Sequence, residues 1–138
     1  MILWFTGQPG SGKTTLADEL SKILPNSGYC DKVFRIDGDD LRDILNNKDY
    51  SEKGRRKNME FAMNMAKVME NKGYWVLVSV VSPFEDLRTG KIIYLKSTRD
   101  LRKEYHVDYY EKPTENYLEL NTDKPIEECI NEILNVCR

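Results

Sequence analysis

The stretch from Gly7 to Thr14 constrains the fold of this chain more than any other feature. It reads Gly-Gln-Pro-Gly-Ser-Gly-Lys-Thr and fits the pattern G-x-x-x-x-G-K-[ST] at every defined position. An apolar run, Ile2–Thr6, precedes it and a helical pattern follows it. In this order of strand, glycine-rich loop and helix, the loop can wrap the phosphates of a nucleotide. The alternative is a glycine-rich turn that binds nothing, and the combination of strand, lysine and threonine disfavours it.

The residue types of this loop predict a site for ATP and Mg²⁺. Glycines let backbone N–H groups turn inward around a phosphate, and the following helix presents its positive end to the anion. Lys13 would reach the β- and γ-phosphate oxygens, and the Thr14 hydroxyl would ligate Mg²⁺. The predicted nucleotide-binding residues of the loop are Gly7, Gly10, Ser11, Gly12, Lys13, Thr14 and Thr15.

Length and composition favour a single domain, residues 1–138, of a small-acceptor kinase. A chain of 138 residues with 40% hydrophobic and 32% charged residues is typical of one folded domain. It has no room for the switch regions and guanine-reading motif of a GTPase. The net charge of −2 disfavours nucleic-acid binding. No apolar run approaches the roughly 20 residues that cross a bilayer, and the N-terminus lacks a basic region and a cleavage site, so we expect a cytoplasmic enzyme.

Apolar runs alternate with helical patterns, which predicts an α/β fold of three layers, with about five parallel strands and helices on both faces. Between the last two strands, residues 97–116 are polar and aromatic, and we expect an irregular lid over the site. The expected strands are Ile2–Thr6, Val33–Ile36, Trp75–Val81 (taken to be central), Lys91–Leu95 and Leu118–Leu120. The expected helices are Lys13–Leu24, Asp39–Leu45, Glu52–Asn71 and Pro125–Val136.

Three aspartates follow the second expected strand, in the run Asp37-Gly38-Asp39-Asp40, and two of them are candidates for the site. Ligands of an open parallel sheet bind beyond the carboxyl ends of its strands, so Asp37 and Asp39 should face the phosphates. One carboxylate would hold Mg²⁺ through water, and the other would orient or deprotonate an acceptor hydroxyl. The alternative is a turn whose aspartates cap the next helix, with Asp39 at the N-cap.

Two further pairs of polar residues are spaced to share a helix face. Asp39 and Arg42 are three positions apart, and so are Arg55 and Asn58 at the start of the long helix. The planar fork of arginine suits phosphate or sulfate. Solvated helix faces are the alternative for any one of these residues, and their joint placement favours an anionic acceptor.

Together these residues resemble the adenylyl-sulfate (APS) kinase family, in a short-lid variant of the P-loop kinases. The resemblance covers about residues 1–95 closely and 108–138 loosely. It rests on Leu3–Gly7, the P-loop, the run Ile36–Arg42, the pattern Tyr50-Ser51-x-x-x-Arg55-x-x-Asn58, the run Val81-Ser82-Pro83-Phe84, and Ile126–Cys129.

The resemblance implies phosphorylation of the 3′-hydroxyl of adenosine 5′-phosphosulfate, with ATP and Mg²⁺. It implies that Asp39 is the catalytic aspartate, assisted by Lys13 and Asp37, and that Thr14 and Asp37 hold the metal. Arg99 would lie at the donor adenine. A homodimer is implied as well, because the family is often dimeric. The implied acceptor-binding residues are Asp39, Arg42, Tyr50 (stacked on the base), Arg55, Asn58, Ser82, Pro83 and Phe84.

The chain departs from the family pattern in two places, and these departures keep other acceptors open. Met59-Glu60-Phe61 stand where the family carries further arginines. The family's lid segment Asp-x-Lys-Gly-Leu-Tyr-Lys is absent, and we expect Arg102 and Lys103 to replace its charge. One alternative is the same reaction on another nucleotide 5′-conjugate, such as cytidine diphosphoramidate. Another is an inactive nucleotide-binding module, which the intact pair of aspartates disfavours.

Overall fold

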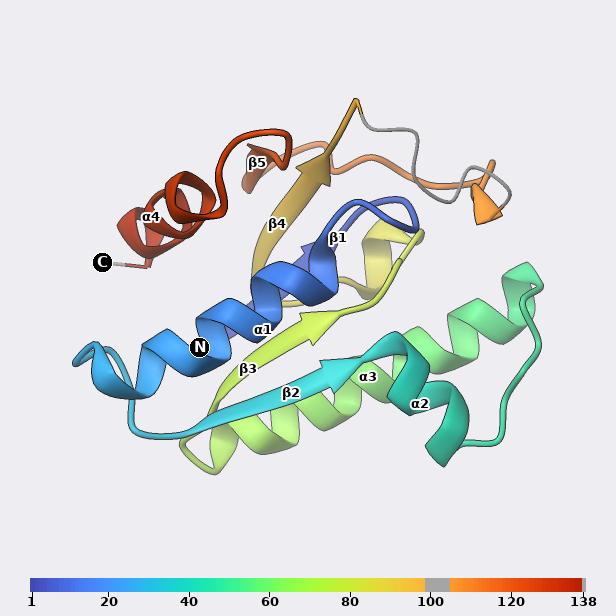
Figure 1. Ribbon diagram of the computed structural model, residues 1–138. Coiled ribbons are helices and arrows are strands. Elements are labelled where there is room, and N and C mark those ends of the chain that lie inside the picture. The colour runs from blue at the N-terminus through green and yellow to red at the C-terminus, as the bar shows by residue number, and fades with distance from the viewer. Residues whose placement is uncertain (99–104, 138) are drawn as a thin grey trace.

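A computed structural model describes residues 1–98 and 105–137, and within them the chain forms a parallel sheet of five strands (Figure 1). The strand order is β2-β3-β1-β4-β5. The strands are β1 (Ile2–Thr6), β2 (Val33–Asp37), β3 (Trp75–Ser79), β4 (Lys91–Lys96) and β5 (Tyr117–Asn121). The predicted fold class is therefore confirmed. The expectation that the third strand is central was wrong: β1 is the middle strand, and β3 lies between β1 and β2.

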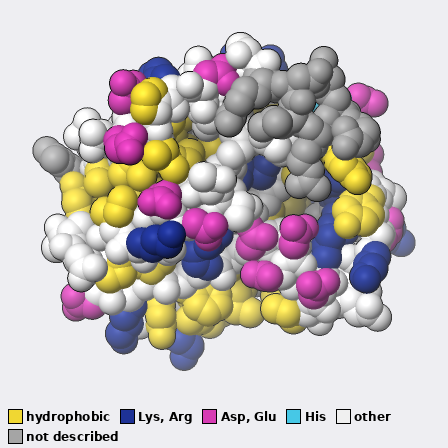
Figure 2. Space-filling view, viewed as in Figure 1, with side chains coloured by type: hydrophobic (Ala, Val, Ile, Leu, Met, Phe, Trp, Pro, Cys, Tyr) yellow, Lys and Arg dark blue, Asp and Glu magenta, His cyan; other side chains and the backbone are white. Residues whose placement is uncertain are grey.

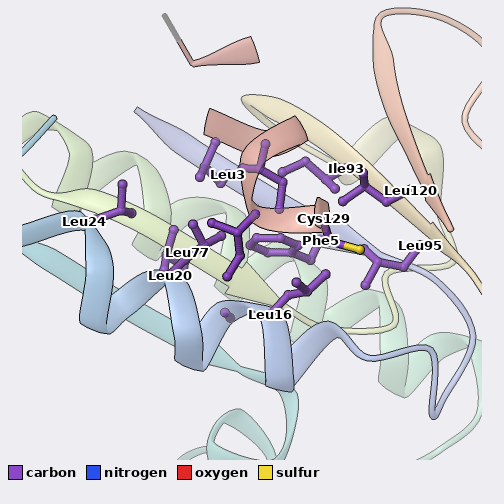
Figure 3. Close-up of a cluster of buried hydrophobic side chains, with 13 residues drawn as sticks. Leu3, Phe5, Leu16, Leu20, Leu24, Leu77, Ile93, Leu95, Leu120 and Cys129 are labelled. Atoms are coloured by element: carbon purple, nitrogen blue, oxygen red, sulfur yellow. The ribbon is translucent and has the colours of Figure 1, made fainter. Parts of the chain in front are cut away.

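Helices cover both faces of the sheet. The helices α1 (Lys13–Ile23) and α4 (Ile126–Val136) pack on one face, while α2 (Gly38–Ile44) and α3 (Glu52–Asn71) pack on the other. Alternation along β1 explains this division, because successive side chains of a strand point to opposite faces. Leu3 and Phe5 belong to the core under α1 and α4 (Figure 3), whereas Ile2 and Trp4 belong to the core under α3.

Several element ends differ from the expected ones by one or two residues. The helix α1 stops at Ile23 and continues as a 3₁₀ turn over Leu24–Asn26, where Pro25 cannot extend an α-helix. The helix α2 begins at Gly38, and its N-cap is Asp37 rather than Asp39. The strand β3 ends at Ser79 instead of Val81, because the chain then turns through Ser82 at a φ of 47°.

The carboxyl ends of the strands lie along one edge of the sheet, as the parallel arrows in Figure 1 show. The loop after β1, the start of α2 after β2, and residues 80–84 after β3 all emerge there. Asp37 and Ser79 are register partners at the ends of β2 and β3. In the described part of the chain no helix has the length and apolarity to span a membrane.

Candidate active site

The glycine-rich loop after β1 owes its shape to residues without a β-carbon. Gly10 and Gly12 have φ values of 83° and 100°, in the left-handed region that favours glycine. A Cβ on Gly7 would lie 2.7 Å from the Ser11 Oγ and 2.8 Å from the Leu95 carbonyl oxygen. Gly12 precedes the first turn of α1, so the backbone amides of the loop and of the helix start share one concave surface.

The side chain of Lys13 lies inside the loop. Its Nζ donates to the carbonyl oxygens of Gly7 (3.0 Å) and Gln8 (2.9 Å) and to the Ser11 Oγ (3.3 Å). Lys13 is buried, and an ammonium group kept in this position is a strong donor for anionic oxygens. A phosphate seated in the loop would offer Lys13 charged acceptors in place of neutral carbonyls.

A hydroxyl–carboxylate cluster joins the loop to the ends of β2 and β3. The Asp37 Oδ1 accepts hydrogen bonds from the Thr14 Oγ1 at 2.9 Å and the Ser79 Oγ at 2.8 Å. The other oxygen of Asp37 accepts from the backbone N–H of Asp39 at 3.3 Å and caps α2. Carboxylate and hydroxyl oxygens are the donor set that Mg²⁺ prefers, so this cluster fits the predicted metal.

A cavity of about 440 Å³ opens between the loop, the starts of α2 and α3, and residues 79–83. It brings together most of the residues predicted from the sequence, on both the nucleotide side and the acceptor side. Gly7 and Ser11 lie in the loop but do not line the cavity. The predicted residues that line it are Gly10, Gly12, Lys13, Thr14, Thr15, Asp37, Asp39, Arg42, Tyr50, Arg55, Asn58, Ser82 and Pro83.

Acidic and basic side chains meet near this cavity. Figure 2 shows Asp and Glu side chains gathered near α2, with Lys and Arg side chains beside them. Arg42 on α2 lies with its Cζ 3.8 Å from the centre of the Tyr50 ring, and the Arg55 Cζ lies 5.6 Å from the same ring. The positive charges of α2 and α3 therefore converge on one aromatic side chain, a setting suited to an aromatic ligand that carries an anion.

Two residues that line the cavity, Arg42 and Asn58, also form hydrogen bonds with the loop between α2 and α3. The Arg42 guanidinium donates to the carbonyl oxygens of Asn47 and Asp49, both at 3.2 Å, and burial lowers its pKa. The amide oxygen of Asn58, which is buried, accepts from the Asn47 Nδ2 at 2.8 Å. Tyr50 remains 60% exposed, so much of its side chain is open to solvent. Arg42 thus holds the loop that carries Tyr50 in addition to lining the cavity.

The structure places Phe84 outside the cavity lining, contrary to its predicted contact with the acceptor. Phe84 is only 4% exposed and belongs to the core between the sheet and α3. Its ring stacks on Tyr109, with centroids 5.8 Å apart, and the Arg56 Cζ lies 5.0 Å from its centre. The chain has a left-handed conformation at Ser82, after which Pro83 lines the cavity and Phe84 packs into the core.

Sequence reasoning missed several residues that shape the cavity. Ser79 bonds Asp37, and the signal available was a serine at the end of the strand beside β2. The Trp4 indole donates to the Ser82 Oγ at 2.9 Å and supports the turn there. Tyr105 lines the cavity from the second part of the predicted lid. Arg99, Arg102 and Lys103 lie outside the described residues.

The described part of the predicted lid, residues 105–116, is irregular as expected. It is attached to both sides of the site by hydrogen bonds. Its Val107 pairs with Gln8 and its Tyr110 with Thr6, while its Glu111 N–H donates to the Pro83 carbonyl oxygen at 2.8 Å. This segment therefore touches both the glycine-rich loop and the turn after β3.

Comparisons with known proteins identify what the chain resembles. The sequence model of the adenylylsulphate kinase family matches residues 1–129. The bifunctional enzyme NodQ of Rhizobium meliloti is 36% identical over 129 residues, which are 93% of this chain and 17% of NodQ. A probable adenylyl-sulfate kinase of Pseudomonas aeruginosa is 34% identical over 131 residues, 94% of this chain and 51% of that protein. The chain therefore spans about half the length of this relative and less of NodQ.

A solved structure gives the same picture. The APS kinase CysC of Mycobacterium tuberculosis, in a mutant form, superimposes with a TM-score of 0.78 at 25% identity. The match covers 97% of this chain and 94% of that one.

Proposed function

Because the chain belongs to the adenylylsulphate kinase family, we propose that it transfers the γ-phosphoryl group of ATP to the 3′-hydroxyl of adenylyl sulfate. The products would be ADP and 3′-phosphoadenylyl sulfate. The observation that carries the proposal is the single cavity in which the glycine-rich loop and the Thr14–Asp37 hydrogen bond face Asp39 and Arg55. A phosphate-binding loop and an anion-binding wall across one cavity suit transfer between two nucleotides.

The donor phosphates would lie in the glycine-rich loop. The backbone amides and Lys13 would stabilise the negative charge on the phosphoryl group as it is transferred, which is the largest catalytic term in reactions of this kind. Thr14 and Asp37 would hold Mg²⁺, which supplies further charge neutralisation on the phosphate oxygens. Ser79 would keep the Asp37 carboxylate oriented.

The acceptor would lie between α2, α3 and the turn at Ser82. Arg55 and Arg42 would bind its anionic group, Asn58 and Pro83 would line its pocket, and the open face of Tyr50 would stack on its base. Asp39 would accept the proton of the hydroxyl. The oxygen of that hydroxyl would form a bond to the γ-phosphorus as the bond to the bridging oxygen of ADP breaks.

The experiment that tests the proposal is an acceptor panel with ATP and Mg²⁺. The panel holds adenylyl sulfate, cytidine diphosphoramidate and an unconjugated nucleotide, and it measures ADP release and the mass of the product. We expect turnover with adenylyl sulfate and its loss when a chelator removes Mg²⁺. ADP release with a non-adenine conjugate alone would reject adenylyl sulfate as the acceptor. ATP binding without turnover on any acceptor would indicate an inactive nucleotide-binding module.

Three wider statements remain predictions. They are that residues 1–138 act as one catalytic domain, that residues 97–116 cover the bound nucleotides with Arg99 at the donor adenine, and that the enzyme is a cytoplasmic homodimer. Size-exclusion chromatography with light scattering measures the assembly state.

A further inference from the structure

The side chain of Gln8, at a variable position of the glycine-rich loop, makes a two-point contact with a distant segment. Its Nε2 donates to the Val107 carbonyl oxygen at 3.0 Å, and its Oε1 accepts from the Val107 N–H at 2.9 Å. Both contacts are made to the backbone of one residue, and Val107 is only 4% exposed. A primary amide that pairs with both the N–H and the C=O of one residue fixes the orientation of the two groups as well as their distance.

A second bond attaches the same segment to the other side of Gly7. The Tyr110 hydroxyl lies 2.7 Å from the Thr6 Oγ1, and Thr6 is fully buried. The Thr6 hydroxyl has one hydrogen, which is directed at the carbonyl oxygens of Val81 (2.9 Å) and Ser82 (3.2 Å). Tyr110 is therefore the donor to Thr6. The segment 107–110 is thus held to residues 6 and 8, on both sides of the first glycine of the loop.

The backbone of Gln8 takes part in the phosphate-binding loop at the same time. Its carbonyl oxygen accepts from the Lys13 Nζ at 2.9 Å and from the Ser11 N–H at 3.1 Å. The segment that Gln8 holds at Val107 leads into the cavity, because Tyr105, two residues before Val107, lines the cavity. Gln8 therefore contacts both Lys13, which would bind phosphate, and the segment whose Tyr105 lines the cavity.

We propose that Gln8 is a positioning residue that couples nucleotide binding in the glycine-rich loop to the placement of residues 105–110 at the cavity. Phosphates bound by the loop amides and Lys13 would restrict the motion of residue 8. The two hydrogen bonds of the Gln8 side-chain amide would transmit that restriction to Val107 and Tyr105. The inference rests on the proposed function only in that the loop binds a nucleotide. It adds a role for a residue that does not itself contact the phosphates through its side chain.

The test is hydrogen exchange of the Val107 amide in the wild type and in Gln8→Met, with and without a non-hydrolysable ATP analogue and Mg²⁺. Methionine keeps the length of the side chain and the backbone amide of residue 8, but it removes both hydrogen bonds. We expect exchange of the Val107 amide about tenfold faster in Gln8→Met without nucleotide. We also expect the analogue to slow this exchange in the wild type and not in the variant.

A matched control is Thr122→Val, which removes a hydrogen bond of 2.8 Å to the Ser11 carbonyl oxygen from the β5 side of the same loop. It should leave the nucleotide-dependent protection of Val107 in place. Calorimetric titration of the analogue accompanies each measurement. Retained binding of the analogue by Gln8→Met, together with lost protection of Val107, separates positioning from general loss of structure. Because coupling is reciprocal, the affinity should fall by no more than the factor by which the analogue slows exchange in the wild type.

Two results would overturn the inference while leaving the kinase proposal intact. One is an analogue that binds the wild type without protecting Val107. The other is equal protection of Val107 in the wild type and in Gln8→Met. Absence of any nucleotide binding by the wild type would reject the proposed function itself, and the coupling with it.

Tyr110→Phe is a second variant that removes the donor to Thr6, and it should weaken the protection of Val107 partially.

Discussion

Asp37 joins the two halves of the site through its hydrogen bonds. One of its oxygens accepts from both Thr14 and Ser79, and the other caps α2. Hydrogen bonds to a charged group each contribute roughly 1.5–3 kcal/mol, so this carboxylate is well oriented before any ligand arrives. The capping role proposed as an alternative function of the aspartates is therefore real, but it falls on Asp37 and is compatible with metal binding.

At the same scale, Asp39→Asn tests the assigned acceptor of the hydroxyl proton. Asp39 lines the cavity, and among the described residues no side-chain hydrogen bond joins it to the glycine-rich loop, so its substitution should not affect the donor phosphates. We expect kcat to fall roughly 10²- to 10⁴-fold with ATP affinity nearly unchanged. Steady-state kinetics and nucleotide titration measure both. The matched control is Asp40→Asn, an exposed neighbour outside the cavity lining; unchanged kcat in Asp39→Asn would remove the assigned role.

Arg55→Ala tests the binding of the anionic acceptor. Arg55 lines the cavity, and a charged donor to phosphate or sulfate should be lost without a change in the loop proposed to hold ATP. We expect the KM for the acceptor to rise about tenfold or more, with the KM for ATP little changed. Arg56→Ala is the control, because Arg56 pairs with Asp86 and stacks on Phe84 instead. A selective loss of ATP affinity in Arg55→Ala would contradict this assignment.

At the scale of elements, the connection between α2 and α3 determines where Tyr50 lies. Residues 45–51 have no regular structure, yet side chains hold them at several points. The Asn47 amide donates to the Gly54 carbonyl oxygen and to Asn58, while the Ser51 Oγ accepts from the Gly54 N–H and caps α3. The start of α3 and the preceding loop therefore form one packed unit, which presents Tyr50 to the cavity.

The close approach at Gly54 leads to a prediction for this unit. A Cβ on Gly54 would lie 2.2 Å from the Asp49 carbonyl oxygen and 2.6 Å from its Cγ, so Gly54→Ala must displace the loop. Alanine favours a helix over glycine by about 1 kcal/mol, but a clash with backbone is larger. We expect a net loss of about 1–3 kcal/mol in the free energy of unfolding, measured by urea denaturation.

The same variant should raise the KM for the acceptor, because Tyr50 follows Asp49. Lys53→Ala, an exposed change in the same helical turn, is the control and should affect neither quantity. A Gly54→Ala protein more stable than the wild type would show that the loop adjusts without cost.

On the scale of the whole molecule, residues 105–114 form hydrogen bonds with the segments at the ends of both β1 and β3. Apart from the contacts with Thr6 and Gln8, the Glu85 carboxylate accepts from the Thr114 N–H and hydroxyl, and the Glu85 N–H donates to Glu111. Arg88 donates to the carbonyl oxygens of Ser82 and Glu111. Hydrogen bonds thus hold the described part of the predicted lid against the rest of the protein.

Tyr110 makes the stability of this arrangement depend on alkaline pH. Burial raises the pKa of Tyr110 from 10.0 to about 12. Below pH 10 the phenol is neutral in both states and its contribution is complete. Between pH 10 and 12 the unfolded chain loses the proton while the folded chain keeps it, so the free energy of unfolding falls by at most about 1.4 kcal/mol per pH unit.

The measurement compares urea unfolding of the wild type with that of Tyr110→Phe at rising pH. Phenylalanine cannot ionise, so the difference in unfolding free energy between the two proteins should shrink from pH 10 upward. The loss of the bond to Thr6 shifts the variant equally at every pH, and ionisation of other groups cancels in the difference. Parallel pH profiles would contradict the assignment.

The sequence by itself determined the features that depend on neighbouring residues. The alternation of apolar runs and helical patterns predicted the α/β fold and four helices to within one or two residues. The glycine-rich loop and the aspartates after β2 could be placed at one edge of a parallel sheet, because that edge follows from strand direction alone. The end of α1 was equally local, since Pro25 cannot continue a helix.

Only the tertiary structure decided which distant residues meet. The pairs Gln8–Val107 and Thr6–Tyr110 are 99 and 104 positions apart, and nothing in their local sequence indicates a partner. The middle position of β1 likewise depends on strand order, and the burial of Phe84 depends on its packing against α3 and Tyr109. Local patterns report which face of an element is apolar, whereas side-chain convergence depends on how the elements are ordered and packed, and that is a property of the whole chain.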